Sequence, residues 1–299
     1  MKAVFLMNMG GARSEKELKQ FLFNMFSDKR IINSPFRYIL APIISNLRYK
    51  KVWKSYELIG GSSIYKHTMN LVNKLNDRID IPIFSVMRYT ENRADKVIKD
   101  NKITKALLLP LYPHFSTTTT LSSFDDVKNI ETIKIERFYK EKKFNEAVMD
   151  RILEALKDWK SEDVNLIFSA HGLPQKIVDA GDSYEKEVNE HIEILSTLLK
   201  NKNINFKSIN LAYQSKVGPM KWLEPSLDDV LKNFKNQKVL VYPISFIIDN
   251  SETDLELAIE YAHQAKELNI DYRVSKVLND SDKFVDFLEE YIKKYLKKL

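Results

Sequence analysis

The sequence predicts an α/β protein with two similar, doubly wound domains, each built on a parallel sheet. Short apolar runs alternate with helical stretches along the whole chain, which is the pattern of parallel strands joined by covering helices. The stretch LLPLYPHFSTTTT (108–120) is echoed by VLVYPISFIIDNSET (239–253), with a Tyr-Pro pair in each. A repeat at this long period indicates duplication of one βα domain. At 299 residues the chain is long enough for two packed domains.

The first domain is predicted over residues 1–159 and the second over residues 160–282, with the last helix (283–299) packing back on the first. Apolar runs bounded by turn residues predict strands, and amphipathic stretches predict helices. Ser14 and Glu17 form a capping-box pattern that begins the first helix. In the first domain we expect strands at 3–7, 81–89, 106–112 and 132–138, and helices at 14–26, 65–77 and 143–159. In the second domain we expect strands at 166–170, 209–214, 238–246 and 272–277, and helices at 183–200, 222–234 and 252–268.

One apolar segment does not fit this alternation. Residues 31–47, IINSPFRYILAPIISNL, are rich in Ile, Leu, Phe and Tyr but are interrupted by Pro35 and Pro42. An apolar segment with such breakers is either a buried crossover or the lip of an apolar pocket.

Composition excludes several kinds of chemistry. The chain has no cysteine, which rules out disulfides, thiolate metal sites, cysteine nucleophiles and a cysteine-ligated iron–sulfur cluster. The net charge is +6, but the lysines are dispersed, so we expect solvated helix faces and no nucleic-acid partner. No run of 18 apolar residues predicts a transmembrane segment. We expect a cytoplasmic protein, for which weak peripheral contact with acidic lipid is compatible with the positive charge.

A histidine marks the end of a central strand. His171 follows the apolar run that ends at Ala170, Gly172 comes next, and Pro174 blocks further strand pairing. Open α/β sheets bind ligands at the carboxyl ends of their strands, so His171 is either a site residue or a structural histidine in a loop.

Acidic residues follow the corresponding strand of the repeat. Glu252, Glu256 and Glu260 are spaced four apart, which places all three on one face of a helix. Glu252 begins that helix next to the predicted cleft, whereas Glu260 is better explained as a solvent-facing residue. A histidine and a carboxylate at one cleft can act as acid and base or can pass a metal ion.

The chain resembles ferrochelatase, the family of lyases that insert ferrous iron into a porphyrin to make haem. The resemblance covers almost the whole chain, and FSAHGLP and the QS-x-x-GP-x-x-WL-x-P segment are its most specific parts. The matching stretches are LMNMGG (6–11), YELIGGSSI (56–64), MRY (87–89), LLPLYPHFSTTTT (108–120), FSAHGLP (168–174), YQSKVGPMKWLEPSLDDVL (213–231) and the interrupted pattern YPISF–SET–LE–EY (242–261).

The resemblance implies two doubly wound domains with the active site in a cleft between them. It implies that His171 is catalytic, with Glu252 as its partner carboxylate on the opposite side of the porphyrin. It also implies that His171, Glu252 and Glu256 handle the metal. The residues implied to contact the porphyrin are Arg88, Tyr89, Ser116, Thr117, Trp222 and Met9.

Two departures from the family pattern stand out. Asn250 and Ser251 occupy positions where the family usually has a histidine and an isoleucine, although Glu252 and Thr253 stay in register. The absence of cysteine means that the iron–sulfur cluster of some relatives is not present here.

We therefore expect a ferrochelatase that inserts Fe²⁺ into protoporphyrin IX, the last step of haem biosynthesis, with iron as a substrate and no permanently bound cofactor. The alternatives are a chelatase for another pair of substrates, such as iron and coproporphyrin III or cobalt and a corrin precursor, and a non-enzymatic haem or porphyrin carrier. The carrier hypothesis leaves the acids on the Glu252 helix without a use.

Overall fold

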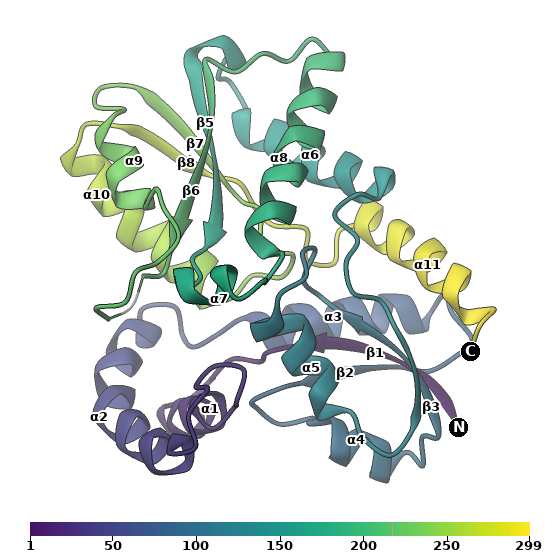
Figure 1. Cartoon of the computed structure of the whole chain (residues 1–299). Helices are drawn as coiled ribbons and strands as arrows, with labels where there is room; N and C mark the ends of the chain where they lie inside the picture. Colours follow the sequence, from purple (N-terminus) through teal and green to yellow (C-terminus); the bar gives the residue numbers. More distant parts are fainter. Residues whose placement is uncertain (217) are drawn as a thin grey trace. The chain divides into compact units, whose positions relative to one another are not determined.

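Two parallel four-stranded sheets form the framework of the chain (Figure 1). The computed structural model describes residues 1–216 and 218–299. The first sheet has the order β2-β1-β3-β4 and the second has the order β6-β5-β7-β8, so the α/β class is confirmed and both sheets share one topology. The strands are β1 (Lys2–Asn8), β2 (Ile83–Met87), β3 (Lys105–Pro110), β4 (Glu131–Lys134), β5 (Val164–His171), β6 (Ser208–Gln214), β7 (Lys238–Pro243) and β8 (Asp271–Val274).

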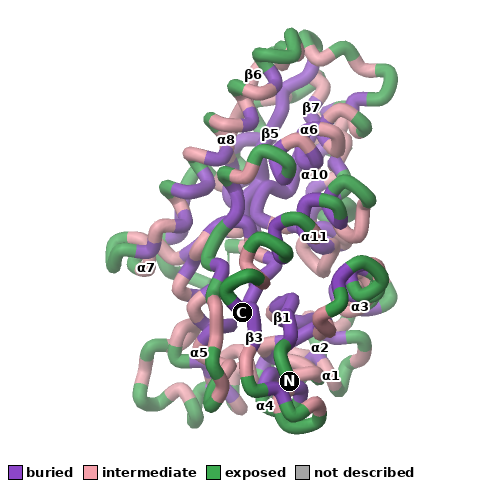
Figure 2. Tube along the Cα trace, turned by 90° about the vertical axis from the view of Figure 1, so that its right-hand side faces the viewer, coloured by how far each residue is buried: buried purple, intermediate pink, exposed green. Residues whose placement is uncertain are grey.

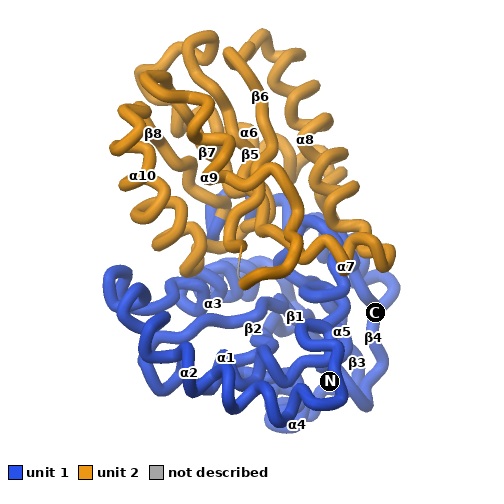
Figure 3. Tube along the Cα trace, turned by 60° about the vertical axis from the view of Figure 1, so that its left-hand side comes forward, with its two compact units in different colours: residues 1–137, 279–299 blue, residues 138–278 orange. Residues whose placement is uncertain are grey.

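The chain divides into two compact units, residues 1–137 with 279–299 and residues 138–278 (Figure 3). The division therefore precedes helix α6 (Lys142–Leu156), whereas the predicted boundary lies near Trp159. Within the second unit, α6 packs against α8 (Tyr184–Asn201) and β7. Within the first unit, the C-terminal helix α11 (Asp282–Leu296) packs against α3 (Ile64–Asn76).

Seven further α-helices belong to the described residues. In the first unit they are α1 (Glu15–Phe26), α2 (Arg37–Glu57), α4 (Ala94–Asp100) and α5 (Ser122–Asp126). In the second unit they are α7 (Gln175–Asp179), α9 (Leu227–Lys232) and α10 (Tyr261–Glu267). The predicted helix 222–234 begins too early: Trp222 instead forms an isolated bridge with Pro174, and the helix starts after its N-cap Ser226.

Burial follows the alternation of the sequence. Figure 2 shows buried residues concentrated along the strands. On one face of the first sheet, Phe5 and Val86 pack with Val97 of α4 and Phe124 of α5. On one face of the second sheet, strand residues pack with α9, α10 and the segment that precedes α10. Both sheets therefore hold their strand ends on a packed core, which is the support that a strand-end site needs.

The ladders give an internal alignment of the two units. The first pairs of the central ladders are Lys2 with Lys105 and Val164 with Lys238. Counting along each strand from these pairs, Met9 holds the position of His171, and Gly10 holds that of Gly172. The same register aligns Pro110 with Pro243. The two Tyr-Pro pairs, Tyr112-Pro113 and Tyr242-Pro243, are therefore three residues out of register with each other. The reason is that Tyr112-Pro113 lies beyond the end of β3, whereas Tyr242-Pro243 ends β7.

Each unit has a π-helix after its third strand. Thr117–Leu121 (η1) follows β3, and Glu252–Glu260 (η3) follows β7. The sequence predicts an ordinary α-helix over 252–268, because apolar spacing does not distinguish the two helix types. π-Helices are rare and often occur at functional sites, so the second one draws attention to Glu252.

The apolar segment 31–47 is mostly helical and exposed. Helix α2 contains Pro42, and Ile39 and Leu47 are 62% and 77% exposed, which rules out a buried crossover. No helix of the described residues combines the length and the apolar character needed to cross a membrane.

Candidate active site

His171 is the last residue of β5, and its backbone is fixed on both sides. Its carbonyl oxygen accepts a hydrogen bond from the Tyr184 hydroxyl at 3.0 Å. The next residue must be small, since a Cβ on Gly172 would come within 2.9 Å of the Gln214 carbonyl oxygen and 3.4 Å of the Trp222 ring. The imidazole also meets the Phe246 ring edge to face, with centroids 6.5 Å apart. These contacts hold the ring in one place at the strand end.

His171 and Glu252 are direct hydrogen-bond partners. Nδ1 of His171 lies 2.7 Å from Oε2 of Glu252, and the two side chains are 37% and 17% exposed. A carboxylate accepts, so Nδ1 carries the hydrogen and Nε2 is the ring nitrogen available to a bound molecule. The predicted arrangement, with the two groups on opposite sides of a porphyrin, is therefore wrong, because nothing fits between atoms at this distance.

The two charges stabilise each other. Burial opposes a charged imidazole, but the charge and the hydrogen bond of Glu252 outweigh it and raise the pKa of His171. Burial likewise opposes ionisation of Glu252, but His171 and the hydrogen bonds from Ser215 and Gln214 lower its pKa. The pair is thus able to hold a proton on the imidazole beside an ionised carboxylate.

A second carboxyl adjoins this pair. The Ser215 hydroxyl lies 2.6 Å from Oε2 of Glu252 and 2.6 Å from Oε2 of Glu256. Burial and the nearby negative charge of Glu252 raise the pKa of Glu256 to about 8. Glu256 is therefore mostly protonated at neutral pH, whereas Glu260, one turn further along, is exposed.

The start of η3 is shaped by Asn250. The side-chain oxygen of Asn250 accepts a hydrogen bond from the backbone N–H of Glu252 at 2.8 Å. The backbone N–H of Asn250 donates to the Thr253 hydroxyl at 3.0 Å. Asn250 thus precedes the N-cap Ser251 and fixes the backbone at the first residue of the π-helix, Glu252, through a local side-chain contact that is common for asparagine.

The predicted metal ligands do not form a closed ligand set. Among the described residues, no group of three or more His, Asp or Glu side chains is arranged to hold a metal ion. These residues therefore form no preformed metal site, and the predicted roles of His171, Glu252 and Glu256 in handling the metal stay predictions.

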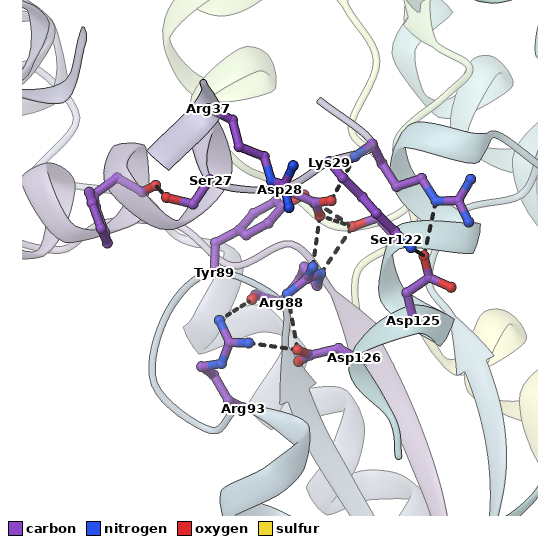
Figure 4. Close-up of polar contacts among 12 residues, drawn as sticks. Ser27, Asp28, Lys29, Arg37, Arg88, Tyr89, Arg93, Ser122, Asp125 and Asp126 are labelled. Atoms are coloured by element: carbon purple, nitrogen blue, oxygen red, sulfur yellow. Dashed lines mark hydrogen bonds and ion pairs between the residues drawn. The ribbon is translucent and has the colours of Figure 1, made fainter. Parts of the chain in front are cut away.

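Arg88 and Tyr89 lie in a buried polar network of the first unit (Figure 4). Arg88 forms ion pairs with Asp28 at 2.8 Å and with Asp126 at 3.0 Å, and its side chain is only 15% exposed. Tyr89 is 1% exposed and donates to Asp28 at 2.9 Å, and the Ser122 hydroxyl also donates to Asp28. Both predicted substrate contacts are therefore already engaged with Asp28.

The charges of this network are nearly balanced. Burial opposes ionisation of Asp28, but hydrogen bonds from Ser122 and the Arg30 backbone and the charge of Arg88 lower its pKa. Burial raises the pKa of Asp126, although the charges of Arg88 and Arg93 oppose this shift. A buried cation between two acids indicates a structural role for Arg88.

The other predicted substrate contacts occupy varied positions. Ser116 is 1% exposed and caps η1 by accepting from the Thr118 N–H at 3.2 Å. Thr117 is the first residue of η1 and is half-buried. Met9, half-buried, follows β1 and packs against the cluster around α1, and Trp222 is 9% exposed beside Gly172.

Sequence reasoning did not assign roles to Gln214, Ser215 and Asp28. Gln214 accepts from the Ser169 hydroxyl at 2.6 Å and donates to Glu252 at 3.5 Å. Gln214 and Ser215 lie at the end of β6, which pairs with β5, the strand that ends at His171. Their position at a strand end beside that of His171 was the sequence signal that could have identified them as site residues. Asp28 has no comparable signal, because it lies in the loop after α1.

The family model and the relatives that match this chain share one description. The ferrochelatase family model matches residues 1–296. The ferrochelatase of Wolinella succinogenes is 49% identical over 300 residues and covers 95% of each chain. That of Nitratiruptor sp. is 44% identical, covering 96% of this chain and 98% of the relative, and that of Helicobacter pylori strain J99 is 43% identical, covering 98% and 92%.

Two solved structures share the fold at low sequence identity. SirB from Bacillus subtilis with Fe³⁺ has a TM-score of 0.56 at 9% identity, covering 98% of this chain and 94% of its own. CbiX, described as the terminal enzyme for biosynthesis of sirohaem in denitrifying bacteria, has a TM-score of 0.51 at 9% identity, covering 98% of both chains.

Proposed function

Since this chain belongs to the ferrochelatase family, we propose that it inserts ferrous iron into protoporphyrin IX to form protohaem. The observation that supports this reaction is the His171–Glu252 pair at the end of β5, with a ring nitrogen left available. The balanced reaction consumes Fe²⁺ and the free porphyrin and releases haem and two protons. The site must therefore accept protons while it admits a cation.

In this proposal, His171 removes a proton from the pyrrole nitrogens of the porphyrin. A porphyrin carries two pyrrole N–H protons, and a metal enters only as they leave. Nε2 of His171 accepts a pyrrole proton, while Glu252 accepts the hydrogen bond from Nδ1–H and stabilises the resulting imidazolium. This is the role in which a buried carboxylate orients an imidazole and balances its charge.

Iron approaches along the acids of η3. Glu252 and Glu256 supply oxygen atoms that suit a divalent cation, and Fe²⁺ would displace the proton that Glu256 holds at neutral pH. We treat iron as a substrate in transit and propose no permanently bound cofactor. With no cysteine in the chain, a cysteine-ligated iron–sulfur cluster is excluded.

The macrocycle contacts remain proposals from the family resemblance. Met9, Ser116, Thr117 and Trp222 are proposed to contact the porphyrin. Arg88 and Tyr89 act instead through Asp28, because their polar groups are held within that network. Their role is to position the strand end of β2 and the start of α5.

The test is an anaerobic insertion assay that follows the loss of free-porphyrin absorbance. Fe²⁺ is offered with protoporphyrin IX, with coproporphyrin III and, in a parallel arm, Co²⁺ with an early corrin precursor. The proposal predicts the highest kcat/KM for Fe²⁺ and protoporphyrin IX. A Soret shift on binding without any metalation would instead identify a carrier. A cytoplasmic location and weak peripheral membrane contact stay predictions from the sequence.

A further inference from the structure

Ser215 has an unusual backbone conformation. It follows the last residue of β6 and has a φ of +67°, in the left-handed region that side chains other than glycine rarely adopt. The other non-glycine residues with positive φ in the described chain are all asparagines or lysines. Asparagine tolerates this region, whereas serine has no such preference. Such a conformation persists when surrounding contacts over-determine it, and it often has a functional reason.

The contacts of Ser215 supply that reason. Its hydroxyl lies 2.6 Å from Glu252 and 2.6 Å from Glu256, so it joins two successive turns of η3 to the end of β6. Gln214, the other polar neighbour of Glu252 on β6, is at the longer distance of 3.5 Å. The His171 contact, the Ser215 contact and the Gln214 contact all reach the same carboxylate oxygen, Oε2.

The shared oxygen matters for the histidine. A carboxylate that rotated away would release Nδ1–H, and the imidazole would then be free to place its hydrogen on either nitrogen. The Ser215 hydroxyl opposes that rotation. It contacts Oε2 from the end of β6, while His171 contacts the same oxygen from the end of β5. In metal sites, the carboxylate or carbonyl behind a histidine sets its tautomer in the same way.

We propose that Ser215 is a positioning residue that holds the Glu252 carboxylate on Nδ1 of His171 and fixes the separation of Glu252 and Glu256. Its unusual backbone conformation places the hydroxyl between the two carboxyl groups. The catalytic consequence rests on the proposed function, since it requires that Nε2 of His171 accept the pyrrole proton. The effect on the tautomer does not depend on that function.

Two substitutions distinguish the effect of the Ser215 hydroxyl from the effect of the backbone conformation. Ser215→Ala removes the hydroxyl and keeps a side chain at positive φ, whereas Ser215→Gly removes the hydroxyl and relieves the conformation. Asn236→Gly is the matched control, because Asn236 also has a positive φ (58°), in the turn before β7, outside the site. We expect the Gly variant to melt at a higher temperature than the Ala variant.

The kinetic arm measures iron insertion into protoporphyrin IX. Both Ser215 variants are expected to lose about tenfold in kcat, with the KM for porphyrin changed less than twofold, while Asn236→Gly keeps wild-type values. A Ser215→Gly variant with wild-type kcat would overturn the proposal, because the hydroxyl would then be dispensable.

The structural arm uses long-range ¹H–¹⁵N correlation of the histidine rings at a pH where His171 is neutral, with His171→Gln to assign its signals. The wild type is expected to show the Nδ1–H tautomer, and both Ser215 variants are expected to show a mixture. An unchanged tautomer in both variants would overturn the positioning role. If the wild type shows no insertion at all, the proposed function fails, but this arm still tests the positioning role.

Discussion

Nδ1 of His171 and Oε2 of Glu252 lie 2.7 Å apart, joining the end of β5 to the first residue of a π-helix. This contact assigns the two groups to one acid–base unit instead of to two faces of a substrate. It also directs attention to Nε2 of His171, since that nitrogen is the one left for proton transfer.

Glu252→Gln is expected to reduce kcat for iron insertion on the order of 10²-fold, because the amide still accepts a hydrogen bond but no longer balances an imidazolium. Without the carboxylate charge, the pKa of His171 should fall, since Glu252 is what raises it. Insertion rates measured across pH, with a ¹⁵N titration of His171, check both effects. An unchanged His171 titration would contradict the ion pair.

Glu256→Gln is expected to stabilise the protein increasingly from about pH 4.5 to pH 8. In this range the folded form keeps the proton, because its pKa is about 8, while the unfolded form releases it at about the ordinary value of 4.5. The folded state binds more protons, so wild-type stability falls as pH rises through this window. The pKa of Glu256 rises from 4.5 to about 8 on folding, and each unit corresponds to about 1.4 kcal/mol, so urea unfolding of both proteins should show a difference on the order of 4 kcal/mol by pH 8.

The control for that experiment is Glu260→Gln, one turn along the same helix and exposed. It should change the free energy of unfolding by less than about 0.5 kcal/mol at every pH, as surface substitutions usually do. A Glu256→Gln difference that does not vary with pH would contradict the raised pKa.

Asp28→Asn is expected to destabilise the first unit by about 3 kcal/mol, because it leaves the charge of Arg88 without one of its two buried partners. The matched control is Asp286→Asn, which removes an acid from the exposed ion pair with Arg78, whose side chains are 36% and 60% exposed. Exposed pairs contribute about 0–1 kcal/mol, so this variant should unfold nearly like the wild type. An equal loss in the free energy of unfolding in the two variants would contradict the stabilising role of the buried Asp28 network.

Gly172→Ala should disturb the strand end that presents His171. The added Cβ would come within 2.9 Å of a backbone carbonyl oxygen, which cannot give way as a flexible side chain can. We expect a loss of about 1–3 kcal/mol in stability, as for overpacked positions, and a fall in kcat. Ala180→Gly, in the exposed turn after α7, is a control of similar size that should leave kcat unchanged.

Much of the fold could be predicted from the sequence, because strands and helices alternate with strong periodicity. The strand that ends at His171 and the helix that begins at Glu252 were both placed correctly. Helices α4, α5 and α7 were missed, since they have at most seven residues and are too short for a periodic signal. The 21-residue helix α2 was missed as well, because it contains Pro42 and exposes several of its apolar residues, so the sequence shows no clear amphipathic pattern there. Neither π-helix was predicted, because apolar spacing does not distinguish a π-helix from an α-helix.

The site was predictable as a set of strand-end residues but not as a geometry. His171 ends β5 and Glu252 follows the neighbouring strand β7, so their proximity follows from the sheet order. The direction of the Glu252 side chain depends on the turn after β7 and on the contact of its backbone N–H with Asn250, and sequence patterns do not predict this geometry. For the same reason, the engagement of Arg88 with Asp28 could not be foreseen.

The most direct test of the central claim is single-turnover insertion of Fe²⁺ into protoporphyrin IX by His171→Ala, compared with the wild type. Proton acceptance by Nε2 predicts a fall in rate of about 10²- to 10⁴-fold, with porphyrin affinity nearly unchanged and partial recovery on addition of imidazole. Wild-type insertion by His171→Ala would contradict the account.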